Sequence, residues 1–127
     1  MTQPPTGDFE VGQIWAYQTR PGEERSVFQV FAITKIPYGR AINIFVSNVR
    51  IKRPVGSFIT TVTHLPYHED YLLASDAKLL SSHHPPPSDQ EGYKEWLLEG
   101  GGKPGGVFTI PLAQCIAYLE LTLNHGK

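Results

Sequence analysis

The hydrophobic pattern of this chain changes period once, near Pro66, and this change most constrains the fold. Before it, apolar residues alternate with a period of two, as in β-strands; after it, they recur every three or four residues, as in amphipathic helices. Strands followed by helices are typical of an α+β fold. We therefore predict an N-terminal curled antiparallel β-meander of four or five strands, packed with about three C-terminal helices.

Turn residues separate the strand-like runs of the first half. Pro21-Gly22 and the segments 37–40 and 52–56 supply the proline and glycine that tight turns need. Short turns between consecutive strands predict a meander. Because several runs are apolar on both faces, we expect another element to cover the outer face. The predicted strands are residues 12–19, 26–35, 41–51 and 57–65.

The second half predicts three helices. Pro66 suits a first helical turn, and the apolar residues after it indicate a helix over residues 67–81. The prolines at 85–87 cannot continue a helix and favour an extended path. Ser88 and Glu91 form a capping box, which predicts the start of the second helix. We expect this helix to end at Gly100, followed by a glycine loop over 100–106 and a fifth strand candidate over 107–110. A last helix over 111–124 follows, with the apolar stripe Leu112, Ile116, Leu119 and Leu123.

The composition fits one small domain. The chain has 127 residues, of which 40% are hydrophobic, enough for a single core. We assign residues 1–8 to a disordered tail and residues 9–127 to one α+β domain, because the first eight carry no apolar side chain beyond Met1. The single cysteine, Cys115, cannot form an intrachain disulfide and falls in the apolar pattern of the last helix, so we interpret it as a packing residue.

Charge and hydropathy limit the partners. A formal net charge of −1 argues against a protein that follows long stretches of nucleic acid by neutralising phosphates. Residues 1–8 have neither the basic residue nor the apolar core of a signal peptide. The longest mostly apolar run, residues 110–123, is too short to span a bilayer. We therefore expect a cytoplasmic protein with no membrane partner.

Four ionised side chains flank the first turn: Arg20, Glu23, Glu24 and Arg25. Arginines beside paired carboxylates can bind a phosphate or exchange protons. The alternative is a solvated hairpin tip whose charges oppose edge-to-edge aggregation. We favour the solvated tip and keep all four as candidate binding residues.

His64 and His68 are four residues apart, a spacing at which two histidines on one helix face can hold zinc. Pro66 lies between them, and His64 should still be in a strand, so we expect no shared helix face. We predict no metal site, no cofactor and no catalytic residue. One of the two histidines should cap the strand–helix junction or titrate near neutral pH, and both remain candidate binding residues.

Trp15 and Tyr17 offer a different kind of candidate surface. Aromatic side chains on a small barrel can stack on nucleobases, and together with Phe28 they can line a small-ligand pocket. The structural alternative is that these residues belong to the core, where aromatic residues of strands more often lie. Both interpretations stay open at this point.

Four segments carry a resemblance to a known family. They are V-G-Q-I-W-A-Y-Q-T-R-P-G-E-E (residues 11–24), H-L-P-Y (64–67), E-G-Y-K-E-W (91–96) and G-V-F-T-I (106–110). Together they resemble a family of small bacterial proteins without an assigned function. The resemblance implies a bacterial source and a stand-alone domain, and it implies no activity, cofactor or site residue.

The first of these segments also resembles the opening of the SH3-like barrel in bacterial endoribonuclease toxins. These toxins often begin with a G-x-[IV]-W strand followed by a Gly-Glu turn, which residues 12–15 and 22–23 match. The basic-proline pair that usually starts their next strand is missing, since Ser26 and Val27 follow Arg25. The resemblance implies an SH3-like partial barrel and activity on RNA.

Three functional hypotheses follow. The first is a non-enzymatic protein-interaction module, of immunity or antitoxin type, whose partner is another protein; a charged turn, a proline-rich loop and no assembled catalytic set favour it. The second is a small-barrel nucleic-acid-binding protein or endoribonuclease that uses the charged turn and His64. The third is a small-ligand-binding barrel. The sequence does not predict the oligomeric state.

Overall fold

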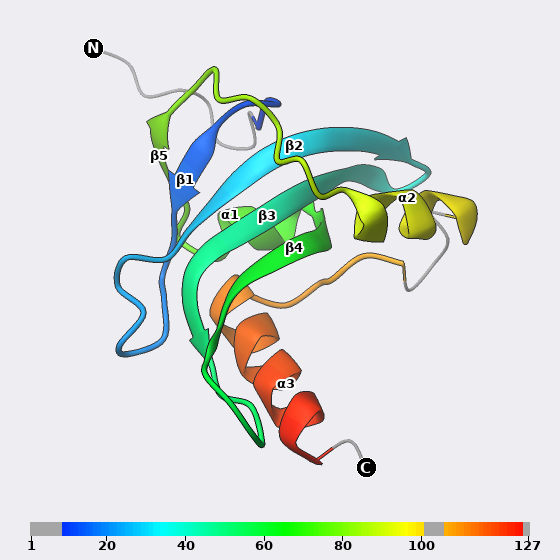
Figure 1. Cartoon of the computed structure of the whole chain (residues 1–127). Coiled ribbons are helices and arrows are strands. Elements are labelled where there is room, and N and C mark those ends of the chain that lie inside the picture. The colour runs from blue at the N-terminus through cyan, green and yellow to red at the C-terminus, as the bar shows by residue number, and fades with distance from the viewer. Residues whose placement is uncertain (1–8, 101–105, 126–127) are drawn as a thin grey trace.

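The computed structural model describes residues 9–100 and 106–125, and within them it has five strands and three helices (Figure 1). The strands form one antiparallel sheet in the order β4-β3-β2-β1-β5. This confirms the α+β class and the four-stranded meander. The predicted tail over 1–8 and most of the glycine loop lie outside the described residues. The elements are β1 Ile14–Ala16, β2 Val27–Ile36, β3 Gly39–Ile51, β4 Ile59–His68, α1 Glu69–Leu73, β5 Lys78–Ser81, α2 Glu91–Leu98 and α3 Leu112–His125.

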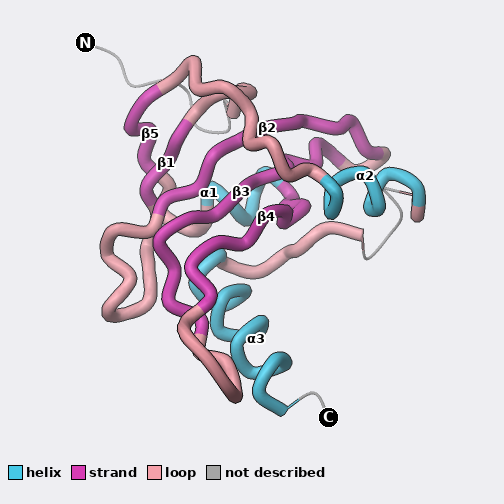
Figure 2. The backbone as a smooth tube through the Cα atoms, in the orientation of Figure 1, coloured by secondary structure: helices cyan, strands magenta, loops and turns pink. Residues whose placement is uncertain are grey.

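The sheet is open and strongly curved. β4 and β5 stand at opposite ends of the strand order, so the sheet does not close into a barrel. Figure 2 shows β2 and β3 bending along their length. The register shifts between Val30 and Ala32 on β2, and twice along β3, and such bulges bend strands and increase their twist.

The hydrophobic core lies on the sheet face that carries α1 and α3. Alternate residues of β2 and β3 point to it, as the period of two predicts. Leu72 of α1 and Ile116 of α3 pack against these strands and are fully buried. The buried strand residues of this cluster include Phe28, Val30, Ile42, Ile44, Val46, Leu65 and Tyr67.

The helix α2 covers part of the opposite, outer face. Figure 1 places it in front of the sheet and α1 behind. Its Tyr93 packs on Phe31 of β2, and its Trp96 on His64 of β4. The prediction that another element covers the outer face is therefore confirmed.

The predicted helix over residues 67–81 is wrong. β4 continues through Pro66 to His68, and the helix α1 is only five residues long. Pro66 is tolerated in the strand because β4 is an edge strand, where a missing backbone N–H need not remove a ladder hydrogen bond. The chain then turns at Asp76, because its φ of 59° is incompatible with a right-handed helix.

The fifth strand therefore comes from a segment that we predicted as helix. β5 pairs with β1, with Leu79 opposite Trp15. Leu80 fitted the helical period of the predicted helix, but in the structure this segment pairs with the edge of β1. In the predicted strand over 107–110, the structure has only an isolated bridge between Phe108 and Tyr67.

Two predictions about helix starts have opposite outcomes. The predicted capping box of Ser88 and Glu91 is wrong, because α2 begins at Glu91. The carboxylate of Asp89 accepts the Glu91 N–H instead, at 3.2 Å. The expected histidine cap is confirmed: Nδ1 of His68 accepts the Asp70 N–H at 3.2 Å. Nε2 of the same ring therefore carries the proton and donates a hydrogen bond to the Tyr38 carbonyl, at 3.0 Å.

The last helix is buried over its first half only. Leu112, Cys115 and Ile116 are fully buried, so Cys115 is a packing residue as predicted, and burial raises its pKa to about 11. Leu123 was predicted on the same stripe but is 42% exposed. Figure 1 shows the reason, since the second half of α3 extends beyond the sheet. None of the described helices is long and apolar enough to cross a membrane.

Candidate functional site

The charged turn has the local geometry that its sequence dictates. Gly22 has a φ of 89°, and the Glu23 N–H donates to the Arg20 carbonyl at 3.1 Å. Proline at the second position and glycine at the third favour this type II turn, because proline presets a negative φ and glycine accepts a positive one. The turn thereby brings the Arg20 and Glu23 side chains together.

Arg20 and Glu23 form a buried ion pair. Nε and Nη2 of Arg20 donate to the two carboxylate oxygens of Glu23, at 2.9 and 2.7 Å. The Glu23 side chain is only 2% exposed, and its Oε2 also accepts the Arg50 N–H at 2.7 Å. The bonds to Glu23 raise the pKa of Arg20 above its usual value. Glu23 is therefore a fixed, charged part of the structure.

The same arginine connects the turn to α3. Nη1 of Arg20 donates to Oε1 of Glu120 at 3.0 Å, and Oε2 of Glu120 accepts the Lys52 N–H at 2.6 Å. The bond from the Lys52 N–H holds the pKa of Glu120 below its usual value. Asn124 completes the contact by donating to the Lys52 carbonyl at 2.8 Å. The turn, the end of β3 and α3 are thus held by one polar network.

Glu24 and Arg25 are on the surface instead. The Glu24 carboxylate accepts the Gly22 N–H at 3.0 Å, and this bond lowers the pKa of Glu24. The Arg25 carbonyl accepts a hydrogen bond from Asn48 at 3.4 Å. Within residues 9–100 and 106–125, no carboxylate lies within ion-pair distance of the Arg25 guanidinium. Of the four predicted residues, Arg20 and Glu23 are therefore structural, and Glu24 and Arg25 face solvent.

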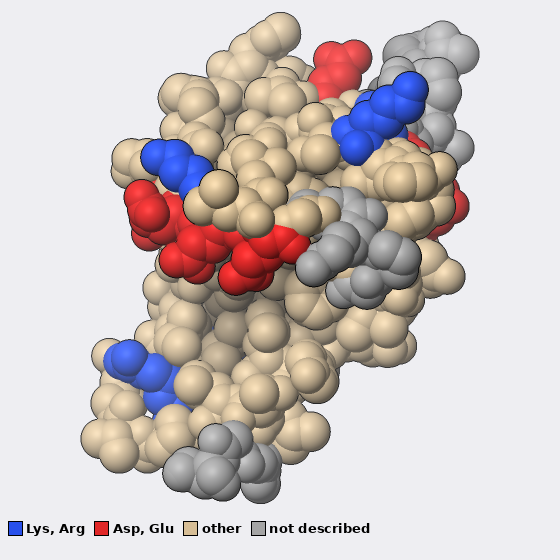
Figure 3. Space-filling model, turned by 90° about the vertical axis from the view of Figure 1, so that its right-hand side faces the viewer, with Lys and Arg blue, Asp and Glu red and all other residues tan. Residues whose placement is uncertain are grey.

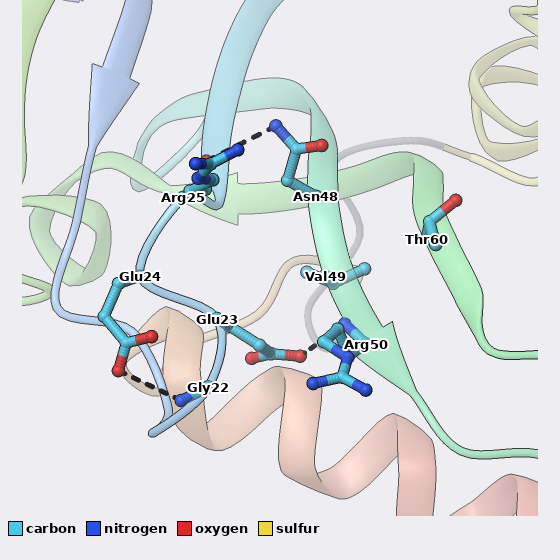
Figure 4. A pocket seen from close by; sticks show the side chains of 8 residues that line it. All are labelled: Gly22, Glu23, Glu24, Arg25, Asn48, Val49, Arg50 and Thr60. Carbon is cyan, nitrogen blue, oxygen red and sulfur yellow. Dashed lines mark hydrogen bonds between the residues drawn. The ribbon is translucent and has the colours of Figure 1, made fainter.

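An open hollow of about 500 Å³ lies beside the turn. Figure 4 shows Arg25 and Arg50 toward opposite ends of it, with Asn48 and Val49 along β3 between them. Thr60 borders the hollow from β4. The lining residues are Gly22, Glu23, Glu24, Arg25, Asn48, Val49, Arg50 and Thr60.

Two further hollows lie near this one. One, of about 190 Å³, contains Phe58, whose ring carries the Arg50 guanidinium at 4.6 Å from its centroid. The other, of about 480 Å³, lies along α3. The first two share Arg50, and the Arg20–Glu120 ion pair connects the second to the third. We call this surface the end surface; it comprises residues 20–25, Asn48, Val49, Arg50, Lys52, Phe58, Thr60, Ala117, Glu120, Leu121 and Asn124.

Trp15 and Tyr17 belong to the core. The Trp15 ring stacks on Phe28 with their centroids 6.3 Å apart, and Phe9 packs on Trp15 at 4.7 Å. The Tyr17 hydroxyl pairs with Ser26 Oγ at 2.7 Å, and burial raises the Tyr17 pKa to about 12. The structure therefore supports the interpretation that Trp15 and Tyr17 are core residues.

His64 lies half-buried under α2. Its Nε2 is 2.8 Å from Oδ1 of Asn43, whose amide nitrogen faces the carbonyls of Ala32 and Ala41. The amide oxygen is therefore an acceptor, and Nε2 of His64 carries the ring proton. The rings of Phe31, Tyr93 and Trp96 surround the imidazole, with centroids 5.6 to 6.0 Å from it. Burial lowers the pKa of His64 from 6.5 to about 4.

The packing of α2 should depend on pH through His64. Because its pKa in the folded protein lies below the usual value, the contribution of neutral His64 to stability is complete above pH 6.5 and is lost as the pH falls toward 4. In a Trp15→Phe variant, Trp96 is the remaining tryptophan, and its emission should shift to longer wavelength over this range. Adding His64→Gln, which does not titrate, should remove the shift; an unchanged transition would contradict the assignment to His64.

The structure gives the two histidines separate roles. His64 packs under α2, whereas His68 caps α1 and stacks on Tyr38. Among the residues that the structure describes, no three His, Cys, Asp or Glu side chains are grouped so that they could hold a metal ion.

Sequence reasoning missed Asn48, Arg50 and Phe58, which complete the end surface. They come from the end of β3 and the loop after it, far from the turn in sequence. The signal in the sequence for this part of the surface was the run of basic residues at Arg50, Lys52 and Arg53. This run alone does not indicate where the end of β3 lies relative to the turn at Pro21-Gly22. Antiparallel pairing of β2 with β3 supplies that information, since Val27 lies opposite Ser47.

Comparison with known proteins gives no relative from which a role could be transferred. No protein-family model, no curated protein and no solved structure matches this chain. The family resemblance of the four segments (11–24, 64–67, 91–96 and 106–110) and the similarity to toxin barrels therefore stay predictions. The end surface is largely exposed, whereas the His64 cluster lies under α2.

Proposed function

We propose that this protein is a non-enzymatic protein-interaction module, of immunity or antitoxin type, and that the end surface is its interface. The observation that carries this proposal is the exposed Arg50–Phe58 stack beside the exposed apolar side chains of α3. Aromatic residues and arginine are enriched where proteins bind each other. An arginine already held over an aromatic ring loses little side-chain freedom when a partner binds.

The outer side of α3 supports the same proposal. Tyr118 is 55% and Leu121 59% exposed, and they lie three residues apart along α3. Val55, in the neighbouring β3–β4 loop, is also exposed. Exposed apolar groups rimmed by polar ones are typical of protein–protein contact sites. The polar network of Arg20, Glu23 and Glu120 would give such an interface a rigid base.

The experiment is co-purification of the tagged protein from the cells that produce it. The wild-type chain should retain one protein in stoichiometric amount, and Arg50→Glu and Leu121→Glu should each lose it. Lys94→Glu, which reverses an exposed charge on α2, is the matched control and should retain it. A clean monomer, or a partner that all three variants retain, would count against the proposal.

Nucleic-acid binding is the second candidate, because Arg25, Arg50, Lys52 and Arg53 are all exposed near the same end of the sheet. Cations on one side of a protein can attract phosphates in spite of a net charge of −1. This candidate includes the predicted SH3-like endoribonuclease. Incubation with total RNA decides it: cleavage or salt-dependent binding that Arg25→Ala or Arg50→Ala removes would favour it.

A further inference from the structure

We propose that the hollow between Arg25 and Arg50 binds an acidic segment of a partner protein, whose carboxylates pair with the two guanidinium groups. The inference rests on the proposed function and names the chemistry of the partner. Figure 4 shows the two arginines toward opposite ends of the hollow. An extended segment can therefore meet both of them with different side chains.

Both arginines are exposed, and Arg50 is already held in place. Neither is within ion-pair distance of a carboxylate in the part of the chain that the structure describes. Arg50 is fixed at both ends, because its N–H donates to Glu23 and its guanidinium lies over Phe58. A planar guanidinium can bind a carboxylate through two parallel hydrogen bonds, which are stronger than bonds between neutral groups.

The acidic residues of the hollow do not cancel this charge. Both oxygens of Glu23 accept hydrogen bonds from Arg20, which neutralises the carboxylate. The Glu24 carboxylate is bonded back to Gly22, and Figure 4 shows it on the side of the turn away from Thr60. The guanidinium groups of Arg25 and Arg50 are therefore the charged groups of the hollow that can pair with a ligand.

The surroundings favour a segment that carries apolar side chains as well. Phe58 and Leu121 line the two further hollows and are 45% and 59% exposed. Asn48 and Thr60 are exposed along the first hollow, where they offer hydrogen-bonding groups to a peptide backbone. A segment that combines carboxylates with aliphatic side chains would match all three hollows.

A polyanion fits this surface less well than an acidic peptide. The net charge of −1 gives little long-range attraction for a nucleic acid. Figure 3 shows acidic side chains gathered in a band on another face of the molecule. On α2, Glu91, Glu95 and Glu99 repeat every four residues and are exposed. These charges would repel a long polyanion, whereas a short segment that stays in the hollow would avoid them.

The test is fluorescence anisotropy with a labelled peptide rich in glutamate and leucine. The wild-type protein should bind it, and Arg25→Gln and Arg50→Gln should each weaken binding about tenfold, as expected for the loss of one charge-assisted pair. Lys94→Gln removes the same charge from α2 and should change the affinity by less than about twofold. The peptide with lysine in place of glutamate should not bind. Circular dichroism and thermal unfolding confirm that each variant is folded.

The outcomes separate this inference from the proposed function. If the arginine variants bind the acidic peptide as the wild type does, or if no acidic peptide binds, the inference is wrong. The proposed function would still stand if Leu121→Glu abolished co-purification of the native partner. Tighter binding of a labelled RNA oligonucleotide, with loss in Arg25→Gln, would overturn the inference in favour of a nucleic acid.

Discussion

Replacing Arg20 by alanine should lower the free energy of unfolding by about 3 kcal/mol, because it leaves a buried carboxylate without its cation. Glu23 is almost fully inaccessible to water, and Arg20 supplies two of the three hydrogen bonds to its oxygens. Arg20 also holds Glu120, so the substitution loosens the contact between the turn and α3. Urea unfolding followed by circular dichroism measures the change.

The matched control is Arg25→Ala in the same turn. Arg25 is exposed and in no ion pair with a described residue, so its removal should change the free energy of unfolding by less than about 0.5 kcal/mol. A double variant, Arg20→Ala with Glu23→Ala, should be more stable than the sum of the two single effects predicts. Equal effects of Arg20→Ala and Arg25→Ala would show that the ion pair does not contribute.

Replacing Phe28 by alanine should destabilise the protein by about 4 kcal/mol, as is typical of a buried phenylalanine that leaves a cavity. The ring is fully buried, and it contacts the rings of Phe9, Trp15 and Tyr17. Phe28, Trp15 and Tyr17 were the candidates to line a ligand pocket, and the result distinguishes that role from packing in the core. A residue that only lines an open pocket tolerates truncation, whereas a core residue does not.

Phe58→Ala is the control for this prediction. Phe58 is 45% exposed and its ring carries the Arg50 guanidinium, so its loss should cost less than about 1 kcal/mol. Thermal unfolding of the two variants side by side gives the comparison. A Phe28→Ala protein as stable as Phe58→Ala would contradict the packing of Trp15 and Tyr17 in the core.

The effect of Arg20→Ala bears directly on the proposed interface. The ion-pair network fixes the turn, the end of β3 and α3, which together present the end surface. Variants that weaken this network would change binding indirectly. Arg25, Arg50 and Leu121 are exposed, so their substitution tests binding with little effect on folding.

The sequence by itself determined β2, β3 and the turn that precedes β2. Alternation predicted β2 and β3 to within two residues at each end, because buried and exposed positions alternate in a strand that has one face in the core. Pro21-Gly22 determined the turn through backbone geometry alone. Chain-local preferences of this kind can be predicted from a few neighbouring residues.

Tertiary structure decided the elements whose local signals were ambiguous. Leu80 fits a helical period as well as a strand, and only the free edge of β1 selected the strand. Pro66 fits a helix start as well as an edge strand, and the pairing of β4 with β3 selected the strand.

The candidate site depended on tertiary structure in the same way. The sequence placed four charges at one turn, but the difference between buried Glu23 and exposed Arg25 depends on Arg50, Glu120 and the end of β3. These groups are 27 and 97 residues from Glu23 in the chain. Hydrophobic periodicity and turn preferences depend on residues that are close in sequence. Burial and ion pairing depend on which distant segments the sheet brings together, and only the folded chain provides that information.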